Sequence, residues 1–402
     1  MAMRMHLHHC LTAGLMLVGA PAWAQSADPV EFRVSHSQQS DSNLFRLPDS
    51  ANVQAVTGRA SASEQIGITS LGVSFHKAIS LQQFELNANL TDYRYQKFDY
   101  LNFTASQYNA AWRWSLTPRL RGRLASERSE TLNNFADVLG STLRNQRTTS
   151  SSALDAEYEI DGPWRVIAGL SQSTLTNSLP VVTGDDYSAD SFSLGLRHVW
   201  ASGSQAGYTF SRTSGDASSG AAAAAAVFDS RFKQVDHAVS LRWLLSGNTS
   251  ADLSAAHVSR THPQFAQRDY SGTNAAAKLT WRLSGKTVLS ADWTRELAGY
   301  QATGIDYIRT NRLSIGPVWQ ISAKVSARLQ HAMTKRDYTG RAAAGVVSRR
   351  HDSLRDTSAS IDWQPHQRIT LSAVLAQARR ASDQAGLDYR SNQVSVSAQL
   401  TY

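Results

Sequence analysis

The sequence contains almost no cysteine and no apolar run long enough to cross a bilayer as a helix. Its 402 residues include one cysteine, Cys10, so a disulfide framework within the chain is excluded. A spanning helix needs about 20 consecutive apolar residues, whereas the one clear apolar run covers only residues 11–20. The mean hydropathy of −0.34 is low for a protein built from membrane helices. These absences argue against a helical membrane protein and against a disulfide-stabilised secreted domain.

The sequence also lacks the short motifs that mark common catalytic sites. It has no Gly-x-Ser-x-Gly motif, no His-Glu-x-x-His motif and no glycine-rich phosphate loop. His351, Asp352 and Ser353 show no spacing that would identify a nucleophile and its base. We therefore expect no enzyme activity, no metal site and no cofactor.

The apolar run at the N-terminus has the features of a secretory signal peptide. Arg4 supplies a positive charge, residues 11–20 form a short apolar region, and a small-x-small site ends at Ala24. This order of features predicts cleavage after Ala24. Residues 1–24 would then be a removed signal, and residues 25–402 would form a single exported domain.

Removal of the signal peptide takes Cys10 and Arg4 with it. The formal net charge falls from +8 to +7 because one arginine is lost. A basic balance suits nucleic acid, anionic lipid or an acidic polymer, and export argues against nucleic acid. An exported chain without disulfides needs another means of stabilisation. A closed barrel provides one, because each strand pairs along both edges.

After residue 25, apolar residues recur at every second position. Phe192, Leu194 and Leu196, for example, alternate with polar or small residues, so in a strand they share one face. The expected strands are about 10–14 residues long, which is long for a soluble sheet and sufficient to cross a bilayer when tilted. The sequence predicts an all-β fold, a transmembrane antiparallel up-and-down β-barrel of about 18 strands. A count of 16 is the alternative, because residues 35–42 are polar and could be loop.

Short and long connections alternate along the chain. Short periplasmic turns and longer outer loops are typical of bacterial outer-membrane barrels. The expected short turns are residues 77–80, 116–118, 161–163, 202–205, 247–250, 284–286, 321–323 and 365–368. The expected outer loops are residues 131–147, 177–187, 213–230, 262–269, 298–306, 338–350 and 379–388.

An aromatic residue recurs just before the short turns. The spacing is about 40 residues, which suits one long hairpin with its connections. Amphipathic rings at one end of alternate strands would form an aromatic belt at the periplasmic interface. The series begins near Phe75 and continues with Trp114, Tyr158, Trp200, Trp243, Trp281, Trp319, Trp363 and Tyr402.

The last strand ends on the final member of this series. Val394, Val396, Ala398, Leu400 and Tyr402 share one face, and polar residues share the other. A terminal aromatic residue with apolar residues at alternate positions is the pattern that barrel-assembly machinery binds by strand addition. We therefore expect this machinery and outer-membrane lipid as partners, and a location in the outer membrane of a Gram-negative bacterium.

Several basic residues alternate with the apolar residues that would face lipid. Because a charge at mid-depth on the lipid side costs about 2–4 kcal/mol, these residues should point into the lumen. An arginine-rich lumen predicts a hydrated path that favours anions; the alternative is a solvated wall in which nearby acids pair with the arginines. The candidates are Arg119, Arg121, Arg123, Arg165, Arg197, Arg242, Lys278, Arg282, Arg312, Lys324 and Arg328.

One segment near the N-terminus does not follow from barrel physics. It resembles the Asp-Asn-Leu-Phe-Arg-Leu-Pro stretch near the start of EpsL-type proteins, except that Ser42 stands between Asp41 and the asparagine. Those proteins are outer-membrane barrels of exopolysaccharide biosynthesis, within a broader β-barrel porin family. The resemblance implies export of a polysaccharide, with periplasmic export proteins as partners. The segment comprises Asn43, Leu44, Phe45, Arg46, Leu47 and Pro48.

The surrounding residues 38–63 are expected to form a polar N-terminal loop or a small plug. Three functions follow from these patterns. The leading one is a passive outer-membrane channel for export of an extracellular polysaccharide. The alternatives are a general or anion-selective diffusion porin, and a structural or adhesive outer-membrane barrel.

Overall fold

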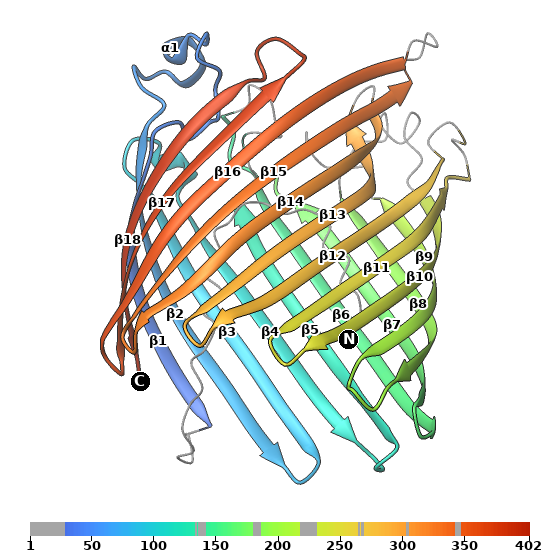
Figure 1. Cartoon of the computed structure of the whole chain (residues 1–402). Coiled ribbons are helices and arrows are strands. Elements are labelled where there is room, and N and C mark those ends of the chain that lie inside the picture. Colours follow the sequence, from blue (N-terminus) through green and yellow to red (C-terminus); the bar gives the residue numbers. More distant parts are fainter. Residues whose placement is uncertain are drawn as a thin grey trace.

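A single closed sheet makes up nearly all of the protein (Figure 1). The computed structural model describes residues 29–132, 135, 142–179, 186–217, 231–263, 266, 269–302, 305–341 and 347–402. Within this part of the chain, eighteen antiparallel strands each pair with their sequence neighbours, and the last strand pairs with the first. The predicted fold class is confirmed, with 18 strands and not 16. The predicted signal peptide, residues 1–24, lies outside the described residues.

The strands run alternately up and down around the ring. They are β1 (Val30–Asp41), β2 (Glu64–Ile79), β3 (Gln82–Tyr95), β4 (Phe103–Ser115), β5 (Leu120–Leu132), β6 (Gln146–Asp161), β7 (Trp164–Asn177), β8 (Tyr187–Val199), β9 (Gln205–Ala217), β10 (Arg231–Ser246), β11 (Thr249–Thr261), β12 (Tyr270–Ser284), β13 (Thr287–Ala302), β14 (Ile305–Ser322), β15 (Val325–Arg341), β16 (Val347–His366), β17 (Ile369–Ser382) and β18 (Tyr389–Thr401). Two short helices, α1 (Val53–Thr57) and the 3-10 helix η1 (Asp99–Leu101), lie in outer connections. In the described residues no helix is both long and apolar enough to cross a membrane.

The ring closes where β1 meets β18. Their register runs from Arg33 opposite Thr401 to Asp41 opposite Gln393. The terminal residue continues this pairing, because the backbone N–H of Tyr402 donates to the carbonyl of Phe32, and that of Phe32 donates to the carbonyl of Tyr402, both at 2.8 Å. We call this contact the β1–β18 seam. It leaves no strand edge unpaired in the bilayer, where an unpaired backbone group would have no water to bind.

The strands extend further outward than the sequence predicted. β16 has 20 residues, and β13 and β14 are separated by residues 303–304 alone, where residues 298–306 were expected to form a loop. Likewise, residues 38–41 belong to β1 and not to the loop or plug assigned to residues 38–63. For β13–β16 the reason is physical: beyond the bilayer both faces of a strand meet water, so apolar alternation stops although strand pairing continues. This reason does not apply to residues 38–40 of β1, which lie beside the lipid-facing Val394 and Val396.

The outward face of the ring carries an apolar band that meets lipid. Large apolar side chains such as Leu375 and Val396 are exposed there, each at 59% of its maximum. The predicted aromatic belt lies next to the short turns on this same face, with Tyr158, Trp200, Trp243, Trp281, Trp319, Trp363 and Tyr402 all exposed. Trp114 lies over Gly122 of the adjacent strand, where a Cβ atom would come within 2.2 Å of its ring.

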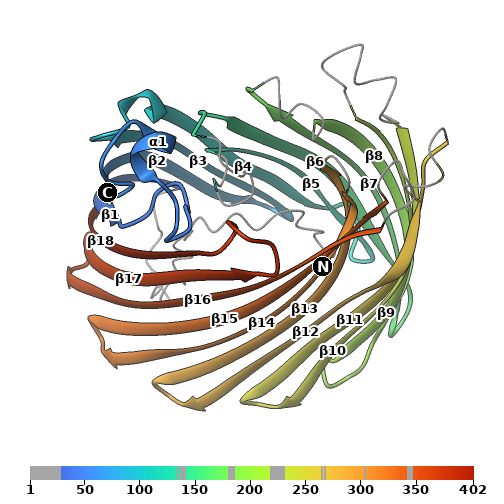
Figure 2. The same ribbon diagram turned by 90° about the horizontal axis from the view of Figure 1, so that it is seen from above.

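A small apolar core lies at the outer mouth, on the inner side of β2–β4. Phe45 packs edge-on against Phe98 and Phe135, at centroid distances of 4.7 and 4.8 Å. Ile66 and Ala105 of the wall complete this core. Seen from above, α1 and its connections lie at the rim beside β1 and β2 (Figure 2). Residues 42–63 therefore cover part of the inner rim.

Removal of the terminal residue tests the closure of the ring. Deletion of Tyr402 takes away two backbone hydrogen bonds, worth about 1 kcal/mol each, together with the ring that rests near Arg368. The folded barrel should convert to its unfolded electrophoretic form at a clearly lower temperature than the wild type. Substitution Tyr402→Phe keeps both backbone bonds and should behave nearly as the wild type. Equal conversion temperatures for all three proteins would contradict this role of the seam.

Candidate functional site

The predicted lumen residues fall into two groups. Nine lie on strands, at positions that alternate with the lipid-exposed residues and therefore face the lumen: Arg121, Arg123, Arg165, Arg197, Arg242, Lys278, Arg282, Arg312 and Arg328. The other two, Arg119 and Lys324, lie in short turns between strands and not in the wall. Lys324 donates a hydrogen bond to the carbonyl of Pro365 in the neighbouring turn, at 3.1 Å.

Four neighbouring strands carry a row of charges of alternating sign across the lumen wall. Arg242 of β10 stands opposite Asp252 of β11, Asp252 opposite Lys278 of β12, and Lys278 opposite Asp292 of β13. The arginine Nε lies 3.8 Å from an Asp252 oxygen, and the lysine Nζ lies 3.9 Å from an Asp292 oxygen. We call these four residues the charged ladder. Cross-strand pairs of opposite charge stabilise a sheet, so the ladder also fixes the strand register.

The side chains of the charged ladder are open to water. Their exposed fractions are 47% for Arg242, 41% for Asp252, 55% for Lys278 and 41% for Asp292. Side chains that filled a narrow barrel would be buried, as in barrels of about eight strands. This part of the wall therefore faces a hydrated space.

A second charged group lies on β5–β8, centred on Glu157. Its two carboxylate oxygens accept from Arg121 at 2.6 Å and from Arg197 at 2.7 Å, and Arg165 lies 3.8 Å away. Arg165 also pairs with Glu159 at 3.0 Å. One carboxylate is thus shared by three guanidinium groups, and this stretch of the wall keeps a local excess of positive charge.

Carboxylates lie near two more of the predicted lumen cations. Arg312 lies 3.8 Å from Asp356, and Arg123 stands opposite Asp155. Among the described residues Arg282 and Arg328 make no ion pair. The sequence interpretation missed Glu157, Asp252 and Asp356. Glu157 and Asp252 alternate with apolar residues and so carry the same signal as the arginines, whereas Asp356 lies between Arg355 and Thr357 and carries no such signal. The wall has mixed charge, which fits the alternative of a solvated, paired lining.

The segment that resembles EpsL-type proteins holds the outer end of the β1–β18 seam. Asp41 is 1% exposed, and its carboxylate accepts from Arg46 at 2.9 Å, Ser391 at 2.7 Å, Gln393 at 2.8 Å and the backbone N–H of Asn43 at 2.9 Å. A buried carboxylate needs such partners, because an unpaired charge there would be strongly destabilising. The four contacts join β1, the segment and β18.

Asn43 and Ser42 extend this junction. The amide nitrogen of Asn43 donates to the carbonyls of Leu47 at 2.8 Å and Arg390 at 3.0 Å, and its oxygen accepts from the backbone of Leu47 at 3.0 Å. Ser42, which interrupts the resemblance, accepts from the backbone N–H of Asn392 at 2.8 Å. Leu44, Phe45 and Leu47 belong to the apolar core of the mouth. The segment therefore joins β1 to β18 at the outer rim and contributes little to the lumen surface.

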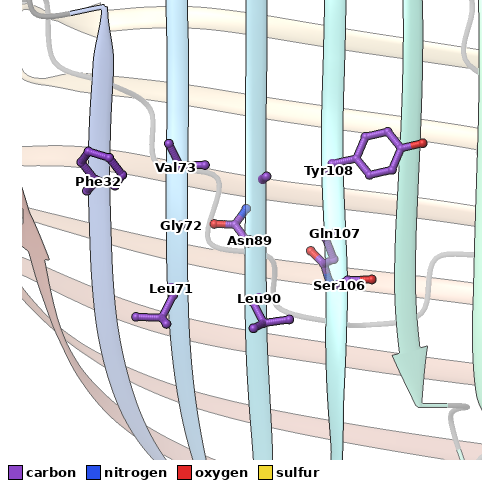
Figure 3. Close-up of a pocket in the computed structure, with 10 residues that line it drawn as sticks. Phe32, Leu71, Gly72, Val73, Asn89, Leu90, Ser106, Gln107 and Tyr108 are labelled. Atoms are coloured by element: carbon purple, nitrogen blue, oxygen red, sulfur yellow. The ribbon is translucent and has the colours of Figure 1, made fainter.

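A shallow depression lies in the wall formed by β1–β4 (Figure 3). Phe32, Leu71, Leu90 and Tyr108 surround it, and all four are exposed on the outward face. Ala88 lies among them and leaves the space unfilled. Its lining is almost entirely apolar and faces lipid, so the depression suits an acyl chain and not a polar substrate.

Comparisons with known proteins agree with this geometry. Residues 233–402, from β10 to the end of β18, match the family described as "Putative beta-barrel porin 2"; this is less than half of the chain. No match is found among curated proteins.

Solved structures of similar fold include two from Pseudomonas aeruginosa. OccK1 (OpdK) is 11% identical, with 93% of this chain and 99% of that chain covered and a TM-score of 0.51. OccK9 (OpdG) is 11% identical, with 93% and 98% covered and a TM-score of 0.50. At this identity the likeness concerns the fold. The chain is thus a porin-like β-barrel of a Gram-negative outer membrane.

Substitution Asp41→Ala tests the seam junction. It leaves Arg46 without its buried partner and should lower the free energy of unfolding by about 3 kcal/mol. Urea unfolding of the barrel in detergent micelles measures this change. Asp49→Ala, an exposed carboxylate of the same connection, is the matched control and should alter stability little. If the two variants lose the same stability, the junction does not have the role that its contacts indicate.

Proposed function

We propose that this barrel is a water-filled channel for passive diffusion of small polar solutes across the outer membrane. The observation that carries the proposal is the exposure of the charged ladder, whose four side chains stay about half accessible to water in the wall of a closed ring. A hydrated lumen lined by polar groups is what diffusion of polar solutes requires. No substrate-specific cleft needs to be invoked, and ion pairs along the wall explain how charges are held there.

The pairing of the lumen charges bears on selectivity. The charged ladder alternates two cations with two carboxylates, so it favours neither sign. The group around Glu157 adds a local positive excess. We infer a weak preference for anions, smaller than an unpaired arginine lining would give.

Polysaccharide export is the second candidate, favoured by the resemblance of residues 43–48 to EpsL-type proteins. The contacts of these residues support a structural role in joining β1 to β18 at the outer rim, so they carry little information about cargo. The two candidates separate in a deletion strain. Loss of surface polysaccharide with unchanged small-solute uptake favours export, whereas slower uptake of small solutes with intact polysaccharide favours diffusion.

Solute uptake by liposomes tests the leading proposal. Purified barrel reconstituted in liposomes should admit neutral sugars at rates that fall smoothly as the sugar becomes larger, because a hydrated pore selects by size. Swelling rates in iso-osmotic sugars measure this. Liposomes that swell no faster than protein-free controls would contradict a diffusion channel.

Substitution Glu157→Gln tests the origin of selectivity. It frees Arg121, Arg165 and Arg197 from their shared carboxylate. One added positive charge about 10 Å from the path in water is worth about 0.4 kcal/mol. It favours an anion and disfavours a cation by this amount, so the anion-to-cation permeability ratio should rise about fourfold at low salt. The reversal potential in a salt gradient measures this ratio. Glu130→Gln removes a carboxylate that pairs with Arg128 on the outward face and should leave the ratio unchanged; an equal shift in both variants would show that the lumen position is irrelevant.

A further inference from the structure

Three arginines stand side by side on the outward face of β16, β17 and β18. Arg355 lies directly opposite Arg379, and Arg379 lies directly opposite Arg390. All three side chains are exposed, on the same side of their strands as the lipid-facing Leu375 and Val394. The three strands run next to one another on the outer surface (Figure 1). We call these residues the arginine row.

In the described part of the chain, no member of the arginine row makes an ion pair. Directly opposite residues in an antiparallel sheet have Cα atoms about 4.5–5.5 Å apart, and like charges in such positions are destabilising. Lys335 of β15 adds a further cation, since it stands opposite Ser353, two positions from Arg355 on its strand.

Several other cations on the outward face have carboxylate partners, although Arg212 of β9 makes no ion pair among the described residues. Arg94 pairs with Asp92 at 2.6 Å and Arg128 with Glu130 at 2.5 Å. Asp337, the carboxylate nearest to Lys335 in the chain, is already engaged by Arg309 at 2.9 Å and by His351 at 2.8 Å. The arginine row differs from these pairs, because three adjacent cations stand together without an ion pair among the described residues.

The height of the row on the barrel identifies the environment that it meets. The apolar band on these strands ends at Leu375 and Val394, which stand opposite each other. Gln377 and Asn392 follow, joined by a side-chain hydrogen bond of 2.9 Å, and the arginines come next. Four residues of a tilted strand rise about 10 Å. The row therefore lies just above the hydrocarbon, at the level of the outer-leaflet headgroups.

We propose that the arginine row binds the phosphate groups of the phosphorylated glycolipid that forms the outer leaflet. A guanidinium group binds a phosphate through two parallel hydrogen bonds, and a row of three presents several such sites within one headgroup's width. A diphosphorylated headgroup offers matching charges at matching depth. Its acyl chains would lie along the apolar band below the row. The lipid then compensates the repulsion that the protein leaves unbalanced.

The arrangement also connects the bound lipid to the β1–β18 seam. The carbonyl of Arg390 accepts a hydrogen bond from Asn43 at 3.0 Å, and its neighbour Ser391 donates to Asp41. A lipid bound by the row would thus contact β18, the strand that closes the ring. Bound glycolipid should stabilise the closed barrel.

The test compares Arg379→Gln with the wild type in two conditions, using full-length mature protein in detergent. With purified lipopolysaccharide added, the wild type should bind at least about tenfold more tightly than the variant, because removal of a charge-assisted hydrogen bond to phosphate weakens binding by at least this factor. Without lipid, the variant should be as stable as the wild type or more so, because removal of the central charge relieves repulsion. Thermal unfolding with and without lipopolysaccharide measures both effects.

Two control variants and a second ligand test whether position, guanidinium geometry and the lipid itself are required for binding. Arg212→Gln removes an exposed outward arginine of β9 whose cross-strand neighbours are Phe192 and Val235, and it should leave lipopolysaccharide binding unchanged. Arg379→Lys keeps the charge without the planar fork and should bind with intermediate affinity. Equal binding by the wild type and Arg379→Gln would overturn the proposal. Stabilisation of the wild type by millimolar inorganic phosphate alone, to the same extent, would also overturn it, because the site would then recognise free phosphate.

Discussion

Closure of the strand ring is the constraint on which the rest of the structure depends. Inside a bilayer an unpaired backbone N–H or C=O has no water to bind, so the last strand must find the first. Here the pairing of β1 with β18 runs up to Asp41 and down to Tyr402. Additional contacts stabilise both ends of this strand pair. At the outer end the buried carboxylate of Asp41 accepts from four donors, and at the periplasmic end the backbone of Tyr402 makes two hydrogen bonds.

Closure of the ring divides the side chains between two environments. One face of every strand meets lipid and becomes apolar, with rings at the periplasmic boundary. The other face lines the lumen, where charges are hydrated and many of them are paired, as in the charged ladder and around Glu157. Above the bilayer the outward face becomes polar again. The arginine row marks that transition on β16–β18.

Much of the fold could be predicted from the sequence, because lipid imposes a simple rule on alternate residues. The rule located the strands, the short turns and the aromatic belt. The rule failed beyond the bilayer, where both faces of a strand meet water, so the outer halves of β13–β16 resembled loop. It also failed at the end of β1, where strand pairing continues although the side chains beside Val394 and Val396 are polar. The alternation rule also predicted which face of the strand each lumen residue occupies, but it did not predict the ion-pair or hydrogen-bond partner of that residue. The contacts of Asp41 with Ser391 and Gln393 join residues about 350 positions apart, and no local pattern reveals them.

The central claim, that the charged ladder lines a hydrated conducting path, can be tested at a single position. Because the only cysteine of the chain is Cys10, Lys278→Cys would carry the sole reactive thiol once residues 1–24 are removed. Single-channel conductance is then recorded before and after a bulky, membrane-impermeant thiol reagent is added. A hollow lumen predicts rapid labelling and a stepwise fall in conductance. Complete labelling with unchanged conductance, or failure of the thiol to react in the folded barrel, would contradict it.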